Sequence, residues 1–179
     1  TESDSHWWKR LKPGEQFISV PAAISVINGT FSQAVGEMTK YRRKIRRNHS
    51  DNVKASVIFN DYMNCLFADP TTEKEKQVID AAAKLGCEYY VVDGGWYSAG
   101  YWWDSVGEWK ESKERFPNGL VEVMDYIRSK GMIPGLWLEP EVLGIHSPVV
   151  KQAKPEWFFT RHWNNIQERS RYQLDYRNP

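Results

Sequence analysis

The chain has 179 residues, enough for one domain with a sizeable core but short of the roughly 250 residues that a closed eight-stranded α/β barrel needs. Its 24 Lys and Arg nearly balance its 23 Asp and Glu, which argues against a nucleic-acid-binding protein and against a protein drawn to anionic membranes. Two cysteines without metal spacing, no apolar stretch of membrane-spanning length and no signal-peptide layout at the N-terminus predict a cytoplasmic protein.

The first fifty residues predict short strands and turns followed by one helix. Residues 11–30 are rich in Val, Ile, Phe, Pro and Gly, a composition typical of strands and turns. Ser32 is a suitable N-cap for a helix over residues 33–47, and the basic run at 42–47 is interpreted as a solvated face of that helix. A polar stretch follows, so we place a domain boundary near Val53.

From Val53 onward the pattern alternates between strand and helix. Predicted strands cover residues 56–59, 88–92 and 132–138, and a last extended piece covers 172–176. Helices over 70–85 and 120–130 lie between the strands, and Gly86 and Gly131 are suitable C-terminal caps for them. Strands that alternate with helices indicate an α/β protein with a parallel sheet.

Polar residues follow each predicted strand. They are Asn60 and Asp61 after the first, Asp93 after the second, and Glu139 and Glu141 after the third. In a (β/α)8 TIM barrel the carboxyl ends of the strands meet at one face, which carries the active site. The turn after the first strand lacks the glycines of a dinucleotide-binding fold, so the barrel is favoured.

Carboxylates at such a face suit acid/base catalysis, metal binding or the gripping of sugar hydroxyls. Asp93 with Glu139 or Glu141 is one candidate pair for glycoside hydrolysis. A metal-dependent lyase or isomerase is a less favoured alternative, because no His stands near a strand end in ligand spacing. Many of the nine Trp and nine Tyr fall in polar loops, which favours a ligand with apolar and hydroxylated faces, such as a sugar.

Several segments carry a family resemblance in the same order along the chain. They are LKPGE (11–15), VVDGGW (91–96), GEW (107–109), RFPNGL (115–120), GMIPGLWLEPE (131–141) and RYQLDYRNP (171–179). Together these segments resemble glycoside hydrolase family 36, the bacterial α-galactosidases or melibiases. The resemblance implies that residues 1–30 end an N-terminal β-sandwich, 31–52 form a linker helix, and 53–179 form the first three β/α units of a partial TIM barrel.

The resemblance also implies roles for individual residues. Asp93 would accept hydrogen bonds from the galactose hydroxyls at C4 and C6, Trp137 would line the sugar pocket, and Trp96 would be a pocket wall. Asn60, Asp61 and Tyr62 would lie at the pocket's edge. The nucleophile and the acid/base are aspartates on later strands in this family, so both are expected beyond Pro179 and no catalytic residue is expected in this chain. The Asp93–Glu139 pair therefore ranks second.

One departure bears on the substrate, because the family commonly shows Asp-Asp-Gly-Trp and here Gly94 replaces the second Asp. The expected function is release of terminal α-linked galactose from melibiose- or raffinose-type oligosaccharides by a retaining hydrolase that needs no metal or cofactor. The alternatives are an α-N-acetylgalactosaminidase of the same family and a non-catalytic sugar-binding fragment. The Trp102-Trp103 pair is a candidate for replacement contacts. The expected partner is the α-galactoside alone, with no nucleic acid or membrane, and the full-length protein is a possible homo-oligomer.

Overall fold

The computed structural model describes residues 9–98, 100–161, 164–165, 167–168 and 170–177. The chain divides into two compact units between Ala55 and Ser56. This division lies close to the boundary that the polar stretch before Val53 predicts. No helix in the described part of the chain has the length and apolar character needed to cross a membrane.

The first unit contains the helix α1 (Phe31–Ile45) and the short turn η1 (Ser50–Asn52). Helix α1 begins two residues before the predicted start, because Thr30 and Gln33 form a capping box: the Gln33 side chain accepts a hydrogen bond from the Thr30 N–H at 2.7 Å. The short strands expected within residues 11–30 are not formed in the described part of this unit. A strand needs a neighbouring strand to satisfy its backbone, and the unit holds none among its described residues.

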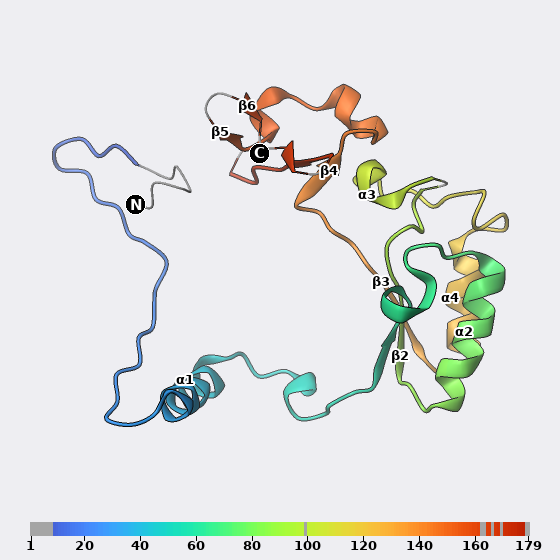
Figure 1. Ribbon diagram of the computed structural model, residues 1–179, viewed down its shortest axis with the longest axis horizontal. Helices are drawn as coiled ribbons and strands as arrows, with labels where there is room; N and C mark the ends of the chain where they lie inside the picture. The colour runs from blue at the N-terminus through green and yellow to red at the C-terminus, as the bar shows by residue number, and fades with distance from the viewer. Residues whose placement is uncertain (1–8, 99, 162–163, 166, 169, 178–179) are drawn as a thin grey trace. The chain divides into compact units, whose positions relative to one another are not determined.

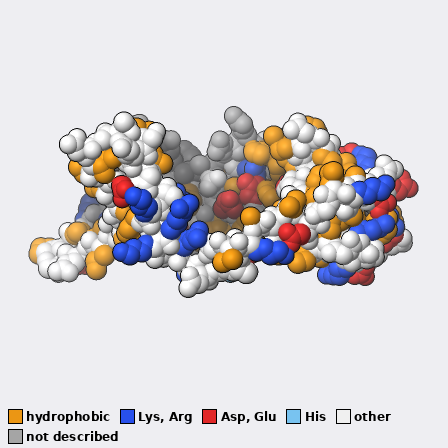
Figure 2. Space-filling view, turned by 90° about the horizontal axis from the view of Figure 1, so that it is seen from below, with side chains coloured by type: hydrophobic (Ala, Val, Ile, Leu, Met, Phe, Trp, Pro, Cys, Tyr) orange, Lys and Arg blue, Asp and Glu red, His pale blue; other side chains and the backbone are white. Residues whose placement is uncertain are grey.

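No residue of α1 is buried, and its basic side chains are solvated. Lys and Arg gather over this helix in the space-filling view (Figure 2), and Thr39, Arg42, Arg43 and Arg46 line a shallow hollow there. The basic residues in the last turn lie where they favour the negative end of the helix dipole.

The second unit is built around a parallel sheet with the order β1-β2-β3. Its elements are β1 (Ile58–Asn60), η2 (Tyr62–Leu66), α2 (Thr72–Lys84), β2 (Tyr89–Val92), α3 (Trp102–Ser105), α4 (Leu120–Ser129) and β3 (Ile133–Leu136). Helices α2 and α4 lie side by side along the sheet (Figure 1). The parallel sheet and both connecting helices confirm the predicted α/β class. Among the described residues β1 and β3 are the edges of this sheet, and the described strands do not close into a barrel.

The core lies between one face of the sheet and the two helices. Tyr90 and Val92 of β2 are fully buried there, as are Ile79 of α2 and Val123 and Ile127 of α4. Alternate residues of the strands point to the opposite face, where Ile58 and Ile133 are more than half exposed. Gly86 (φ 78°) and Gly131 (φ 80°) end α2 and α4 in the left-handed conformation that favours glycine.

The chain after β3 differs from the expected third β/α unit. Short turns and short antiparallel strands take the place of an α-helix: β4 (Val142–Gly144), η3 (Pro148–Gln152), η4 (Pro155–Trp157), β5 (Thr160–Arg161), β6 (Asn164–Asn165), β7 (Gln167–Glu168) and β8 (Arg171–Gln173). Strand β8 pairs with β4 and β7, and β5 pairs with β6. Gly144, Pro148 and Pro155 interrupt this stretch too often for a helix to continue.

Candidate functional site

The three parallel strands bring polar and aromatic residues to one end of the sheet. Asn60 is the last residue of β1, Asp93 follows β2 directly, and Trp137 follows β3 directly. The Trp137 N–H donates to the Val92 carbonyl at 2.9 Å, which continues the parallel pairing to the strand ends. Asp93 and Trp137 therefore emerge from neighbouring strands at the same rim.

The Asp93 carboxylate is held from two sides. Its Oδ2 accepts a hydrogen bond from the Asn60 Nδ2 at 2.6 Å, and its Oδ1 accepts one from the Gly94 N–H at 2.6 Å. The residue is 9% exposed. A carboxylate has about four lone-pair sites, and the two that remain are fixed in direction by these donors. Asp93 therefore keeps acceptor capacity for two further hydrogen bonds.

Asp61 is buried behind Asp93 and does not lie at an open edge. It is 2% exposed, and its Oδ1 accepts a hydrogen bond from the Asp93 N–H at 2.8 Å. The burial of Asp61 raises the pKa of its carboxyl, although its hydrogen bonds with Glu75 and the Asp93 N–H lower the pKa. The physical role of Asp61 in this structure is to hold the backbone of Asp93, since its own oxygens do not reach solvent.

Glu75 of α2 completes the buried acidic cluster. It is fully buried, and its Oε2 accepts a hydrogen bond from the Tyr90 hydroxyl at 2.7 Å. Burial, followed by the hydrogen bond and the charge of Asp61, raises the pKa of Glu75 to about 10. Burial and the nearby Glu75 also raise the pKa of the Tyr90 hydroxyl. At neutral pH, Glu75 is therefore a neutral acid.

Trp137 lies within a cluster of indole rings. The Trp102 and Trp109 rings pack edge-to-face against it, with centroids 5.6 and 6.1 Å away. Trp96, expected to be a pocket wall, is only 4% exposed and belongs to the core. Its Nε1–H donates to the Trp137 carbonyl at 3.0 Å, so Trp96 supports Trp137 from behind.

Trp102 packs directly over Gly94. A Cβ atom at position 94 would lie 2.9 Å from the Trp102 Cε3 atom, closer than real Cβ contacts come. The indole thus occupies the space into which a side chain at position 94 would project. Glycine at this position is a packing requirement of the Trp102 ring.

Tyr62 lies beside the same ring and opens onto the surface. Its ring packs edge-to-face on Trp102 at 5.6 Å between centroids. Tyr62, Tyr101, Trp102, Trp103 and Ser170 line an open hollow with a volume of about 360 Å³. Aromatic rings that border an open hollow suit the C–H faces of a sugar.

Glu139 does not pair with Asp93. It forms an ion pair with the buried Arg171 of β8, whose guanidinium lies 3.9 Å from the Trp103 ring centroid. This arrangement ties the loop after β3 to the antiparallel strands, so Glu139 is occupied as a structural ion-pair partner. Among the described residues, no three His, Cys, Asp or Glu side chains lie close enough to share a metal ion.

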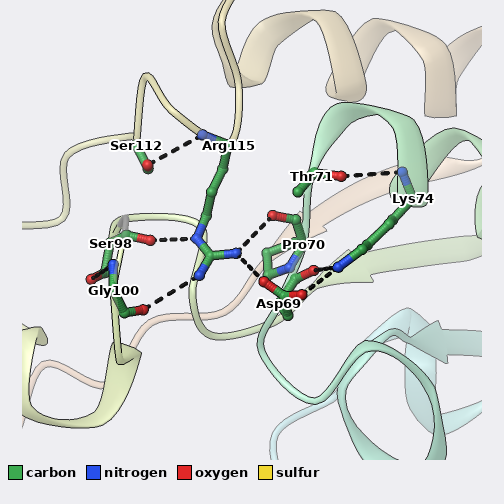
Figure 3. Close-up of polar contacts among 8 residues, drawn as sticks. All are labelled: Asp69, Pro70, Thr71, Lys74, Ser98, Gly100, Ser112 and Arg115. Atoms are coloured by element: carbon green, nitrogen blue, oxygen red, sulfur yellow. Dashed lines mark hydrogen bonds and ion pairs between the residues drawn. The ribbon is translucent and has the colours of Figure 1, made fainter.

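Arg115 joins the loop after β1 to the loop after β2 (Figure 3). Its guanidinium donates to the carbonyls of Ser98, Pro70 and Gly100 and pairs with the Asp69 carboxylate. Asp69 also pairs with Lys74 of α2, and the hydrogen bonds from Lys74 and Arg115 lower the pKa of Asp69. These contacts set the positions of both loops that lead to the rim.

The role of Glu75 in this region was not predicted from the sequence, whereas the Trp102-Trp103 pair is a sequence-predicted candidate for contacts near Gly94. Glu75 shares the buried face of α2 with Ile79 and Ala82, at spacings of four and seven residues. An acid within an apolar helical stripe is the signal that would have identified it.

Comparisons with known proteins identify the family of the chain. The family model for melibiase matches residues 21–179. The chain is 34% identical over 152 residues to alpha-galactosidase Mel36A of Lactobacillus acidophilus, and 31% identical over 155 residues to alpha-galactosidase AgaA of Geobacillus stearothermophilus. These matches cover 81% and 82% of the chain, respectively. The chain spans about a fifth of the length of either relative.

A solved structure supports the same relationship. A crystal structure of a GH36 alpha-galactosidase AgaA variant from Geobacillus stearothermophilus, in complex with raffinose, superimposes with a TM-score of 0.66 at 27% sequence identity. The superposition covers 81% of this chain and 20% of the other. The ordered segments from the LKPGE and VVDGGW motifs onward, the parallel sheet and the match over most of the chain lead to one conclusion: the chain belongs to the melibiase family, glycoside hydrolase family 36.

Proposed function

We propose that this chain supplies the galactose-recognition part of a retaining α-galactosidase barrel that acts on melibiose- or raffinose-type oligosaccharides. The two catalytic aspartates are expected on later barrel strands, beyond the part of the family that this chain represents. The observation that supports the proposal best is the Asp93 carboxylate, fixed by Asn60 and the Gly94 N–H at the rim where Trp137 emerges. A GH36 relative has been crystallised with raffinose, which agrees with this substrate class.

The specificity follows from the cost of leaving a polar group unpaired. A hydroxyl that reaches Asp93 replaces the water lost when the sugar covers the rim. A sugar with the hydroxyl in the wrong orientation leaves the remaining lone pairs of a desolvated carboxylate unpaired, which costs about 1–3 kcal/mol or more. Discrimination between galactose and its C4 epimer glucose is therefore assigned to Asp93.

Binding to the 179-residue chain tests the proposal. We expect methyl α-D-galactopyranoside to shift the indole N–H NMR signals of the tryptophans, and methyl α-D-glucopyranoside to bind more weakly. Asp93→Asn is expected to weaken galactoside binding about tenfold or more, because it removes the charged acceptor. Asp125→Asn is the matched control, since Asp125 is exposed on α4. Equal binding by Asp93→Asn and the unmodified chain would remove Asp93 from the site.

Hydrolysis separates the enzyme from a sugar-binding module without catalysis. We expect the 179-residue chain to leave p-nitrophenyl α-D-galactopyranoside intact, and a longer protein that continues through the next barrel strands to hydrolyse it. Hydrolysis by the 179-residue chain would show that the nucleophile lies within it. Binding without hydrolysis in the longer protein would favour the non-catalytic module.

The packing of Trp102 over Gly94 favours a second substrate, an α-linked N-acetylgalactosaminide. The space that an acidic side chain at position 94 would occupy holds an indole ring, so the rim offers one carboxylate and a wide apolar surface. The methyl group of an acetamido substituent is compatible with such a surface. Tighter binding of methyl N-acetyl-α-D-galactosaminide than of methyl α-D-galactopyranoside would establish this alternative.

A further inference from the structure

The buried acid Glu75 has no part in the recognition described above, yet it lies directly behind it. Its side chain is fully buried on the face of α2 that also carries Ile79 and Ala82. An ionised carboxylate in such surroundings costs several kcal/mol, so a buried acid that persists there is expected to be neutral and hydrogen-bonded.

A continuous line of hydrogen bonds runs from the core through Glu75 to the rim. The Tyr90 hydroxyl donates to Glu75 Oε2 at 2.7 Å. Glu75 Oε1 and Asp61 Oδ2 are buried oxygens that no other donor among the described residues reaches, and the two carboxyl groups shift each other's pKa. At the other end of Asp61, Oδ1 accepts from the Asp93 N–H at 2.8 Å. The line therefore reaches from β2 through α2 and the end of β1 back to Asp93.

One proton must lie between the two acids, because two ionised carboxylates cannot donate to each other. A proton between these two oxygens satisfies both of them, and we place it on Glu75, which is the more deeply buried acid and has its pKa raised to about 10. Asp61 is then the charged partner. A charged acceptor holds the Asp93 N–H more strongly than a neutral one would.

We propose that Glu75, as a neutral acid, is a positioning residue that fixes Asp93 by donating its proton to Asp61. The sugar-binding consequence rests on the function proposed above for Asp93, but the mechanical link from Glu75 to the Asp93 backbone does not. Glu75 touches no ligand in this scheme and acts only through Asp61.

The groups around the pair make the link sensitive to pH. Three other described titratable side chains act on the pair: Asp93, which follows β2, Tyr90 of β2, and Cys65 of η2. All three are acids. No described cation contributes to the shifts of this pair. When Glu75 ionises at alkaline pH, its negative charge repels that of Asp61 with no described cation nearby to offset the repulsion. The hydrogen bond to Asp61 is then lost.

Two variants of the 179-residue chain separate this role from simple packing. Glu75→Gln keeps a donor for Asp61 and an acceptor for Tyr90, whereas Glu75→Leu has a similar volume and neither. The position of Asp93 is followed through its amide signal in ¹⁵N NMR spectra, and sugar affinity through the dissociation constant for methyl α-D-galactopyranoside. Ile79→Ala is the matched control, because it weakens the packing of the same buried helix face without touching the line.

We expect Glu75→Gln to keep the Asp93 amide signal and an affinity within about twofold, and Glu75→Leu to shift the signal and weaken binding about tenfold. The unmodified chain should lose affinity at alkaline pH, and Glu75→Gln should not. A folded Glu75→Leu chain with an unchanged Asp93 signal and affinity would overturn the inference, as would an equal effect from Ile79→Ala. Neither the unmodified chain nor its variants binding sugar, with the Asp93 amide signal still shifted in Glu75→Leu and kept in Glu75→Gln, would leave the positioning role standing and refute the proposed function.

Discussion

At the scale of single residues, the rim is defined by what holds Asp93. Asn60 and the Gly94 N–H fix its carboxylate, and Asp61 fixes its backbone. Of these three neighbours only Asn60 is exposed to solvent, whereas Gly94 and Asp61 are buried. Asp61 and Trp96, both expected at the pocket, are buried and support the residues that face it.

Glu75 gives the folded chain a pH dependence of defined sign. Its pKa is raised in the folded state, so the stability it confers is fully present below its ordinary pKa, near 4.3, and is lost as pH rises toward the raised value. The slope is at most about 1.4 kcal/mol per pH unit. Glu75→Gln should flatten the decline in the free energy of unfolding between pH 5 and 9, measured by urea denaturation. Parallel curves for the two proteins would contradict this.

Gly94 and Trp102 are expected to act as a unit. Gly94→Asp alone forces a side chain against the Trp102 ring, which should cost about 1–3 kcal/mol of stability. Adding Trp102→Ala should recover most of that loss and increase the preference for methyl α-D-galactopyranoside over the N-acetylgalactosaminide, measured by calorimetric titration. Gly100→Ala is the control, because its Cβ meets open space. Additive effects of the two substitutions would show that the residues act independently.

At the scale of elements, the positions of the rim residues depend more on the loops after β1 and β2 than on the strands themselves. The loop from Asp61 to Pro70 contains three residues other than glycine with positive φ: Asn64, Phe67 and Ala68. Such backbone is unfavourable unless its surroundings hold it. Arg115 supplies part of that hold through Asp69 and the Pro70 carbonyl (Figure 3).

Arg115→Ala should loosen both loops at once. The guanidinium is largely buried and satisfies several carbonyls, so its loss should lower the free energy of unfolding by about 2 kcal/mol. Amide hydrogen exchange should accelerate between residues 94 and 98 and at the start of α2. Arg128→Ala on α4, whose ion pair with Asp125 is exposed, should change stability by less than about 1 kcal/mol. Unchanged exchange in the Arg115 variant would assign the loop positions to other contacts.

At the scale of the whole molecule, the sheet has one covered face and one that is open to solvent. Helices α2 and α4 cover the face with Tyr90 and Val92, while Ile58 and Ile133 stand in one row on the other. Strands β1 and β3 are also unpaired along their outer edges in the described structure. An open apolar face with free edges favours association.

The 179-residue chain should therefore self-associate as its concentration rises. Ile58→Lys combined with Ile133→Lys should reduce the association, measured by sedimentation velocity, because charges then stand on the open face. Val121→Lys is the control, since Val121 is equally exposed but lies on α4. A chain that stays monomeric at high concentration, with a sharp and reversible unfolding transition, would show that this face needs no cover.

The sequence by itself determined the family and the main elements of the parallel sheet and its two covering helices. Hydrophobic periodicity and the capping glycines placed α2, α4 and the three parallel strands, because these signals are local. The ordered motifs predicted the melibiase family, which the comparisons confirm. Strand ends also indicated that Asn60 and Asp93 would meet, since parallel strands end at one edge, and the family resemblance placed Trp137 with them.

Only the tertiary structure decided which of those residues face the rim and which stand behind it. The burial of Asp61 and Trp96 and the hydrogen bonds that join Glu75 to Tyr90 and Asp61 to Asp93 depend on contacts between segments far apart in the chain. The position of Trp102 over Gly94 depends on how the loop after β2 folds back on itself. The antiparallel strands after β3 likewise depend on pairing between β4 and β8, across about thirty residues of chain. Long-range packing sets solvation, and solvation decides whether a carboxylate binds a ligand or supports the group that does.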